Sequence, residues 1–337
     1  VCAAARGGYR LPVARRGGWR RLGTKRFRYV TASGEVIRDE EQLERIRALA
    51  IPPAWNEVWI SPNPRARIQA TGIDAAGRKQ YRYHASFRAA QDRAKFEQLL
   101  DFAKALPDLR ATTSRHLRNG VGERDWTCAL AVGLVNKAWF RVGSDRHTRR
   151  SRTYGVTTLT KRHASVERDE VQFCFRAKNR RLVRRTIRNA TLARGVARLL
   201  GLPGGGRLFR YERDGELVAL TAPDLNEYLA ENMGDGFTAK DFRTWGGTLL
   251  AASELARHGP AEDERAAKRT IAAVMRSVGE ELGNTAAVAR ESYVSPAVID
   301  AYLDGRTLDD YQRASRRPPR LSQDERALVR LLRAAAR

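Results

Sequence analysis

Tyr293 stands where one predicted helix ends and another begins. The stretch NTAAVARESYVSPAVID (residues 284–300) predicts a helix of small and apolar residues, a break, and a second helix with Ser295 as its N-cap and Pro296 as its first residue. A tyrosine beside such a break has two interpretations. Its ring packs and its hydroxyl finds a local partner, as for most tyrosines, or the ionisable hydroxyl has a chemical role. The rest of the chain must decide between them.

Three basic residues are candidates for chemistry on a phosphate. Phosphoryl transfer spreads negative charge over the non-bridging oxygens, and the planar guanidinium of arginine can bind two such oxygens. Arg141 follows the apolar run ALAVGLVNKAWF and is predicted to end a helix just before Gly143. Arg243 lies early in another predicted helix, and Lys178 lies at the tip of a predicted hairpin. In so basic a chain each of them could equally be a solvated surface residue.

Charge is the most informative part of the composition. The 337 residues include 63 Lys and Arg against 38 Asp and Glu, which gives a formal net charge of +25 at pH 7, while the 42% of hydrophobic residues is typical of a folded chain. Such an excess predicts binding to a polyanion, and nucleic acid is the first candidate. No segment approaches the roughly 18 consecutive apolar residues of a transmembrane helix, so no membrane partner is expected.

Cysteine and histidine do not predict a metal or cofactor site. Cys2, Cys128 and Cys174 are odd in number and scattered, and the five histidines include no HExxH motif. The Gly-rich run GLPGGG (201–206) is not followed by Gly-Lys-Ser/Thr, so it is not a phosphate-binding loop. We expect a protein of a reducing compartment that uses neither metal nor cofactor.

Residues 1–90 are predicted to form a mainly antiparallel β domain. Strand-like runs occur in RFRYVTASGEVIRD (26–39), NEVWISP (56–62), ARIQATG (66–72) and GRKQYRYH (77–84), with a short helix in EEQLERIRALA (40–50). The preceding Arg-rich residues predict a disordered basic arm that leads into the first strand.

Residues 91–337 are predicted to form a larger, mainly α domain. Apolar residues at helical spacing predict separate helices over 86–106 and 107–117, followed by helices over 123–142, 221–233, 238–258, 263–282 and 322–337. Alternation in YGVTTLT (154–160), EVQFCFRA (170–177) and RLVRRTI (181–187) predicts a three-stranded antiparallel sheet. The expected fold class is therefore α+β.

The order of the candidate residues resembles a known catalytic set. Along the chain come Arg141, the hairpin residue Lys178, the Lys-x-x-Arg motif of Lys240 and Arg243, and Asn284 nine positions before Tyr293. This order resembles the catalytic pentad of the tyrosine recombinase and type IB topoisomerase superfamily. The run IPPAWNEVWISPNPRARIQATGIDAAGRKQYRYH (51–84) resembles the signature of the small poxvirus and bacterial type IB DNA topoisomerases.

The resemblance implies a role for each member of the pentad. Tyr293 would attack a DNA phosphodiester, form a 3′-phosphotyrosyl link and release a 5′-hydroxyl. Lys178, assisted by Arg141, would protonate that leaving oxygen. Arg141 and Arg243 would bind the non-bridging oxygens, and Asn284 would donate a third hydrogen bond. A tyrosine with the ordinary pKa near 10 needs such cations close by to become phenolate-like.

Four further residues match DNA-contacting positions of the family, namely Gln80, Tyr81, Tyr83 and Lys240. For Tyr81 and Tyr83, two apart in a strand, the alternative is that they simply share a buried face.

Two departures from the family's pattern limit what can be carried over. Asn284 stands where poxvirus enzymes and most recombinases have His, so proton exchange is not expected there. Ser144 and His147 stand where poxvirus enzymes have Lys and Tyr that contact their preferred site, so a strict pentamer preference is not expected either.

The resemblance implies a monomeric type IB topoisomerase that clamps double-stranded DNA, nicks one strand, lets the free end rotate and reseals without ATP or metal. We expect it in the cytoplasm of a bacterial cell, associated with the nucleoid. A site-specific tyrosine recombinase is the nearest alternative, although recombinases usually have His-x-x-Arg and a helical amino-terminal domain. A non-enzymatic basic DNA-binding protein is the other alternative, and its DNA binding would not depend on Tyr293.

Overall fold

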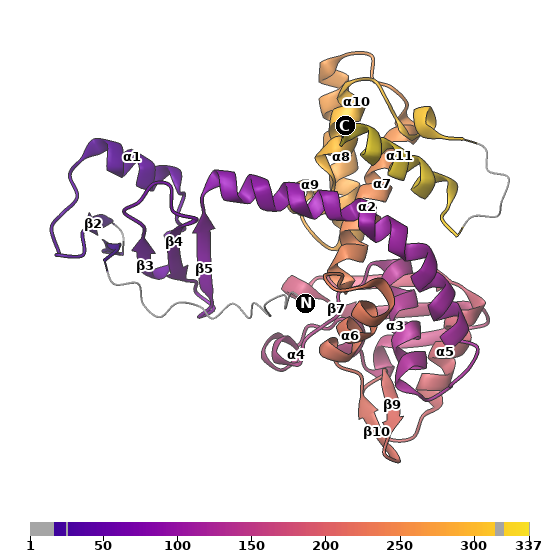
Figure 1. Ribbon diagram of the computed structural model, residues 1–337. Helices are drawn as coiled ribbons and strands as arrows, with labels where there is room; N and C mark the ends of the chain where they lie inside the picture. The colour runs from indigo at the N-terminus through magenta and orange to yellow at the C-terminus, as the bar shows by residue number, and fades with distance from the viewer. Residues whose placement is uncertain (1–16, 25, 314–319, 337) are drawn as a thin grey trace, which may run out of the picture. The chain divides into compact units, whose positions relative to one another are not determined.

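The computed structural model describes residues 17–24, 26–313 and 320–336, with the side chains at 89, 92 and 93 left out. The chain divides into two compact units, Val1–Lys95 and Phe96–Arg337. The first contains a five-stranded sheet, and the second is largely helical with a three-stranded sheet (Figure 1). The predicted α+β class is confirmed. No helix in the described ranges is long and apolar enough to span a membrane.

The first unit is an antiparallel sheet with strand order β2-β1-β3-β4-β5. Ile46 of the helix packs with Val58, Ile60 and Ala70 of the strands in a small buried core. The elements of this unit are β1 (Trp19–Leu22), β2 (Arg28–Val30), α1 (Glu40–Ala48), β3 (Asn56–Ile60), β4 (Ile68–Ile73) and β5 (Lys79–Tyr83).

Strand β1 lies in the segment that was expected to be a disordered arm, so this expectation is wrong for Trp19–Leu22. Trp19 packs against the small core, and the Arg21 guanidinium donates to the carbonyl oxygen of Pro52 at 3.1 Å. The half-buried side of the strand therefore includes an arginine, which hides the apolar alternation in the sequence. The arm up to residue 16 lies outside the described residues.

Helix α2 (Ala85–His116) is continuous through Pro107, so the prediction of two separate helices is wrong. Proline removes one backbone donor and disfavours the helix around it. Here Leu106 and Leu109, on either side of that region, are both buried in the core of the second unit, and this packing holds the helix together.

The three-stranded sheet has the order β6-β7-β8, but its first strand is not YGVTTLT. Residues Val156–Thr158 form a short 3-10 helix, η1, and are buried. The Thr157 and Thr158 hydroxyls donate to the carbonyl oxygens of Val142 and Gly155, at 3.0 and 3.1 Å. Alternation in the sequence predicted a strand here, whereas these hydroxyls are buried with backbone partners. The strands are β6 (Ala164–Glu167), β7 (Glu170–Arg176) and β8 (Leu182–Arg188).

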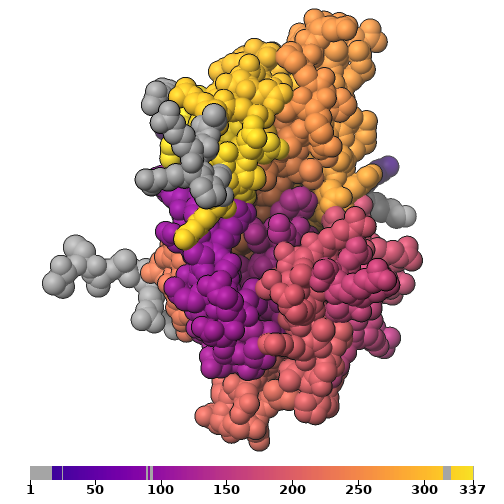
Figure 2. Space-filling model, turned by 90° about the vertical axis from the view of Figure 1, so that its right-hand side faces the viewer, coloured from indigo at the N-terminus to yellow at the C-terminus, as the bar shows by residue number. Residues whose placement is uncertain are grey.

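The helices of the second unit form two groups, with α7 (Ala239–His258) in contact with both. Figures 1 and 2 show α8, α10 and α11 together in one lobe, and the segment from α3 to β10 in the other. Helix α7 contacts α3 and α6 as well as α8, α10 and α11. The remaining helices are α3 (Arg124–Ala138), α4 (Asp145–Ser151), α5 (Ala190–Gly201), α6 (Ala222–Met233), α8 (Glu264–Leu282), α9 (Ala286–Ser292), α10 (Pro296–Leu303) and α11 (Gln323–Ala335).

Short elements complete this unit. They are the 3-10 turns η2 (Lys161–His163), η3 (Lys178–Arg180) and η4 (Leu308–Tyr311), and a hairpin of β9 (Arg210–Arg213) and β10 (Glu216–Ala219) that was not predicted.

Candidate active site

Tyr293 occupies the predicted break between two helices. It is the C-cap residue of α9, and its backbone N–H donates to the Ala289 carbonyl oxygen at 3.0 Å. Helix α10 follows with Ser295 as N-cap and Pro296 at its start, as expected, although the Ser295 side chain makes no capping hydrogen bond. The Tyr293 side chain is only 6% exposed, so a phenol is held inside the catalytic unit.

Helix α7 braces the backbone around Tyr293. The fully buried Thr248 hydroxyl donates to the Tyr293 carbonyl oxygen at 3.1 Å and accepts the Ser295 N–H at 3.1 Å. A Cβ on Gly247 would lie 3.0 Å from the same carbonyl oxygen, so glycine allows the close approach. Thr248 was missed in the sequence because a threonine in a helix has no signal of its own, although the Gly246-Gly247 pair beside it indicates close packing.

Arg243 is buried beneath the Tyr293 ring. It is 4% exposed, and its guanidinium carbon lies 5.0 Å from the ring centroid. One terminal nitrogen donates to the Leu282 carbonyl oxygen at 2.6 Å, and the other donates to the Trp139 carbonyl oxygen. These bonds join the ends of α3 and α8 to α7. Burial, and then the charge of Arg141, lower the Arg243 pKa to about 10, so the side chain remains a cation at neutral pH.

Arg141 was expected to end a helix, and this is wrong. Helix α3 ends at Ala138, and Trp139 caps it in the left-handed conformation with φ of 53°. Arg141 therefore lies on an irregular segment. The Val156 N–H donates to the Arg141 carbonyl oxygen at 2.8 Å, and a Cβ on Gly155 would lie 2.5 Å from that oxygen. The buried turn that resembled a strand in the sequence thus fixes the backbone of this arginine.

The Arg141 side chain joins two other candidate residues. Its Nη1 donates to Tyr293 Oη at 3.4 Å, and its Nη2 donates to Asn284 Oδ1 at 2.8 Å. Asn284 Nδ2 donates to the Leu282 carbonyl oxygen at 3.3 Å. Asn284, expected as a donor to phosphate, therefore uses its carbonyl oxygen to orient Arg141. The structure brings together four of the five residues of the predicted pentad.

The two arginines determine the acidity of Tyr293. Burial alone raises the pKa of a tyrosine, as it does for Tyr228, because the phenolate loses hydration. Burial acts in the same direction on Tyr293, but the charges and hydrogen bonds of Arg243 and Arg141 together outweigh it and lower the Tyr293 pKa to about 8. A buried tyrosine with this pKa is prepared to form a phenolate.

Lys178 is placed differently from the other four. It is exposed on η3 at the tip of the β7–β8 hairpin, and no hydrogen bond joins its ammonium to another side chain in the part of the chain that is described. Asn179 and Arg180 after it have left-handed backbone, with φ of 61° and 59°. The hairpin tip is as predicted, but the structure does not bring Lys178 into contact with Tyr293.

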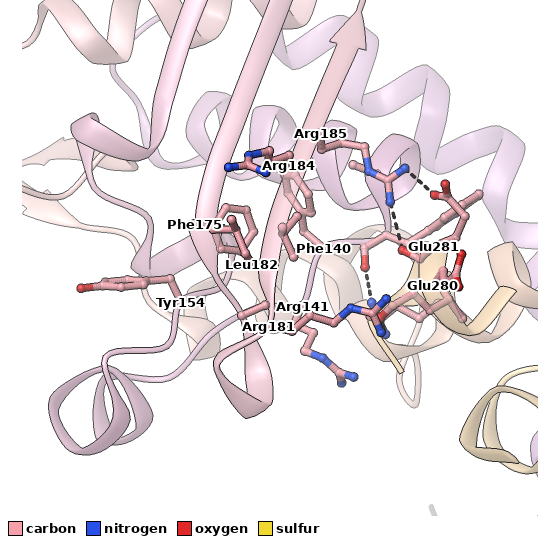
Figure 3. Close-up of a pocket in the computed structure, with 17 residues that line it drawn as sticks. Phe140, Arg141, Tyr154, Phe175, Arg181, Leu182, Arg184, Arg185, Glu280 and Glu281 are labelled. Atoms are coloured by element: carbon pink, nitrogen blue, oxygen red, sulfur yellow. Dashed lines mark hydrogen bonds and ion pairs between the residues drawn. The ribbon is translucent and has the colours of Figure 1, made fainter. Parts of the chain in front are cut away.

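A cavity of about 210 Å³ lies between this hairpin and the end of α8 (Figure 3). Its lining includes Arg141 and Arg243 together with Arg181, Arg185 and Glu281. Across the described residues, no group of three or more His, Cys, Asp or Glu side chains is placed to hold a metal ion.

The remaining predicted DNA contacts lie on both units. Lys240 is exposed in the first turn of α7, one turn before Arg243. In the first unit, Gln80 on β5 donates to Asp74 at 2.8 Å. Tyr81 and Tyr83 share one face of β5 with ring centroids 6.0 Å apart, but Tyr83 is 39% exposed, so this face is not buried throughout.

Comparisons with known proteins agree on one family. Residues 84–304 match the model of the catalytic core of eukaryotic DNA topoisomerase I, and residues 26–74 match that of the N-terminal domain of bacterial DNA topoisomerase IB. The chain is 33% identical over 289 residues to DNA topoisomerase 1B of Acanthamoeba polyphaga mimivirus, covering 83% of this chain and 85% of that protein. The chain therefore belongs to the type IB DNA topoisomerases, a family of isomerases that act on DNA.

Proposed function

We propose that this topoisomerase nicks one strand of duplex DNA by attack of Tyr293 Oη on a phosphodiester. The observation that carries the proposal is the position of the phenol, buried between Arg141 and Arg243 with its pKa lowered to about 8. The attack forms a bond from Oη to phosphorus and breaks the bond to the 5′-oxygen, which leaves a 3′-phosphotyrosyl link.

Arg141 and Arg243 bind the non-bridging oxygens as negative charge develops on them. A preorganised cation stabilises such a transition state without reorganising during the reaction.

Lys178 donates a proton to the leaving 5′-oxygen. A hairpin tip with an exposed ammonium can reach a substrate bound outside the core, which suits a general acid. Religation is the reverse reaction. The 5′-hydroxyl attacks the phosphotyrosine, Lys178 takes up the proton, and Tyr293 leaves as the phenolate that the arginines stabilise. The energy of the broken bond is kept in the ester, so no ATP is required.

Gln80, Tyr81, Tyr83 and Lys240 bind DNA outside the reacting phosphate, and one molecule clamps one duplex as a monomer. Between cleavage and religation the free strand end rotates and supercoils relax. The expected place of action is the bacterial nucleoid.

A short duplex from which the cleaved end dissociates tests the covalent step. The strand labelled at its 5′ end should become attached to the protein in EDTA, and proteolysis should recover the label on the peptide that contains Tyr293. Tyr302→Phe, which alters another buried tyrosine nearby on α10, should leave the yield unchanged. Attachment of the 3′-labelled end, or of another residue, would contradict the proposal.

A further inference from the structure

Apolar packing holds one face of the β7–β8 hairpin against the core, and Ala177 and Val183 beside the tip take part in it. Phe173 and Phe175 of β7 pack edge-on against Phe140, with ring centroids 5.2 and 5.3 Å apart. Towards the tip, Leu182 is 45% exposed and Lys178 is exposed as well. Apolar burial therefore fixes this face of the hairpin but includes neither the Lys178 side chain nor any contact with α8.

The cavity beside the active site separates this end of the hairpin from α8. It lies against Phe175, Leu182 and Val183 on the hairpin side and against Glu281 and Leu282 on the helix side. Because side chains do not fill this space, close packing does not fix the hairpin relative to α8. The position of the hairpin relative to α8 therefore depends on polar contacts across or around the cavity.

Two arginines of the hairpin make these contacts. Arg185 on β8 forms an ion pair with the Glu281 carboxylate, and its Nη2 donates to the Glu281 carbonyl oxygen at 3.0 Å (Figure 3). Arg181 Nη1 donates to the Asn284 carbonyl oxygen at 3.1 Å. The backbone of Arg181 also closes the tip, since its carbonyl oxygen accepts the Ala177 N–H at 2.8 Å. Lys178 is the next residue after Ala177.

These contacts link Lys178 to the rest of the site through a short series of bonds. Arg181 holds the backbone of Asn284, and the Asn284 side chain holds Arg141, which contacts Tyr293. A shift of the hairpin would therefore change the distance between the proton donor and the phosphate-binding arginine. Misplacement of a catalytic group by about 1 Å can cost a large factor in rate.

We propose that the Arg185–Glu281 pair and Arg181 are positioning residues that hold Lys178 where it can protonate the leaving oxygen. The proposal rests on the general-acid role of Lys178 given above. Glu281 is an acidic residue in a site that binds anionic DNA, and DNA binding alone would not explain it. A role in positioning Lys178 gives it a function.

Glu281→Gln tests this with little direct effect on DNA affinity, because it removes no cation. The variant should cleave an ordinary phosphodiester about 10-fold more slowly than wild type in single turnover. With sulfur in place of the 5′-bridging oxygen, the leaving group needs little protonation, and the variant should cleave within about twofold of wild type. The DNA dissociation constant should not rise, because the change removes a negative charge and no cation.

The matched control is Glu170→Gln. It breaks the ion pair with Arg188, whose side chain is 84% exposed, at the other end of the same hairpin. An exposed pair of this kind contributes little, so we expect less than about a twofold change on either substrate. The double variant Glu281→Gln with Lys178→Ala should be no slower than Lys178→Ala alone, because both act on one step.

Equal slowing of Glu281→Gln on both substrates would overturn the inference, since the defect would then not be in proton donation. No slowing on the ordinary substrate would overturn it as well.

Lys178→Ala separates this failure from that of the proposed mechanism. If sulfur does not rescue Lys178→Ala, the general-acid role and the positioning inference both fail. If sulfur rescues Lys178→Ala but not Glu281→Gln, only the positioning inference fails.

Discussion

Arg243 and Tyr293 are 4% and 6% exposed and are bonded to backbone groups of several helices, whereas Lys178 is exposed at a hairpin tip. Tyr293, the proposed nucleophile, and Arg243 are therefore part of the core of the catalytic unit. The hairpin that presents Lys178, the proposed proton donor, is joined to the end of α8 by the polar contacts of Arg181 and Arg185. One active site can thus combine a buried part that lowers the pKa of a tyrosine with an exposed part whose position depends on a few contacts.

Loss of the buried cation should have the largest effect. Arg243→Ala should slow cleavage by about 10²- to 10³-fold, as expected for the loss of a transition-state donor. It also leaves the Trp139 and Leu282 carbonyl oxygens without this partner, so the melting temperature should fall. Single-turnover cleavage, DNA affinity and thermal unfolding measure the three effects. A loss of DNA affinity as large as the loss of rate would instead make Arg243 a DNA-binding residue.

Loss of the exposed cation should affect the rate without affecting stability. Lys178→Ala should slow cleavage of an ordinary phosphodiester by about 10²-fold and be largely rescued by a sulfur leaving group. Its melting temperature should equal that of wild type, because the side chain makes no described hydrogen bond. A fall in melting temperature like that of Arg243→Ala would contradict the distinction between the two parts of the site.

Loosening the brace on Tyr293 should have an intermediate effect. Thr248→Val keeps the shape of the side chain but removes the hydroxyl that joins the Tyr293 carbonyl oxygen to the Ser295 N–H. We expect cleavage to slow about 10-fold through misplacement of the phenol, with DNA affinity unchanged. Thr248→Ser keeps the hydroxyl and should restore most of the rate. Equal rates for the two variants would show that the hydroxyl is not responsible.

The smallest signal should come from the titration of Tyr293 itself. Its pKa in the folded protein, about 8, lies below the value near 10 of an unfolded chain, so phenolate formation stabilises the fold as pH rises from 8 to 10. This contribution is complete above the unfolded pKa and is lost as pH falls through the folded pKa. Ultraviolet absorbance should show one tyrosine ionising near pH 8 in wild type and none in Tyr293→Phe. The same titration in both proteins would contradict the lowered pKa.

The buried part of the site could be predicted where short sequence motifs indicate the ends of helices. Ser295 and Pro296 predict the start of α10, and thus the break at Tyr293. Its partners could not be derived from local pattern, since Arg141 and Asn284 are far apart in the chain and only the family resemblance grouped them.

The errors arose where tertiary packing overrides local preference. Pro107 is helical because leucines on both sides of it are buried. Thr157 and Thr158 are buried with backbone partners in a short 3-10 helix, although alternation there predicted a strand. The contacts that Arg181 and Arg185 make with the end of α8 had no signal at all in a chain with so many arginines.

Relaxation of supercoiled plasmid in EDTA without ATP, by wild type and by Tyr293→Phe, is the decisive measurement. Wild type should relax the plasmid, whereas the variant should bind the plasmid equally well but leave it supercoiled. Relaxation by the variant would contradict the claim that Tyr293 is the nucleophile.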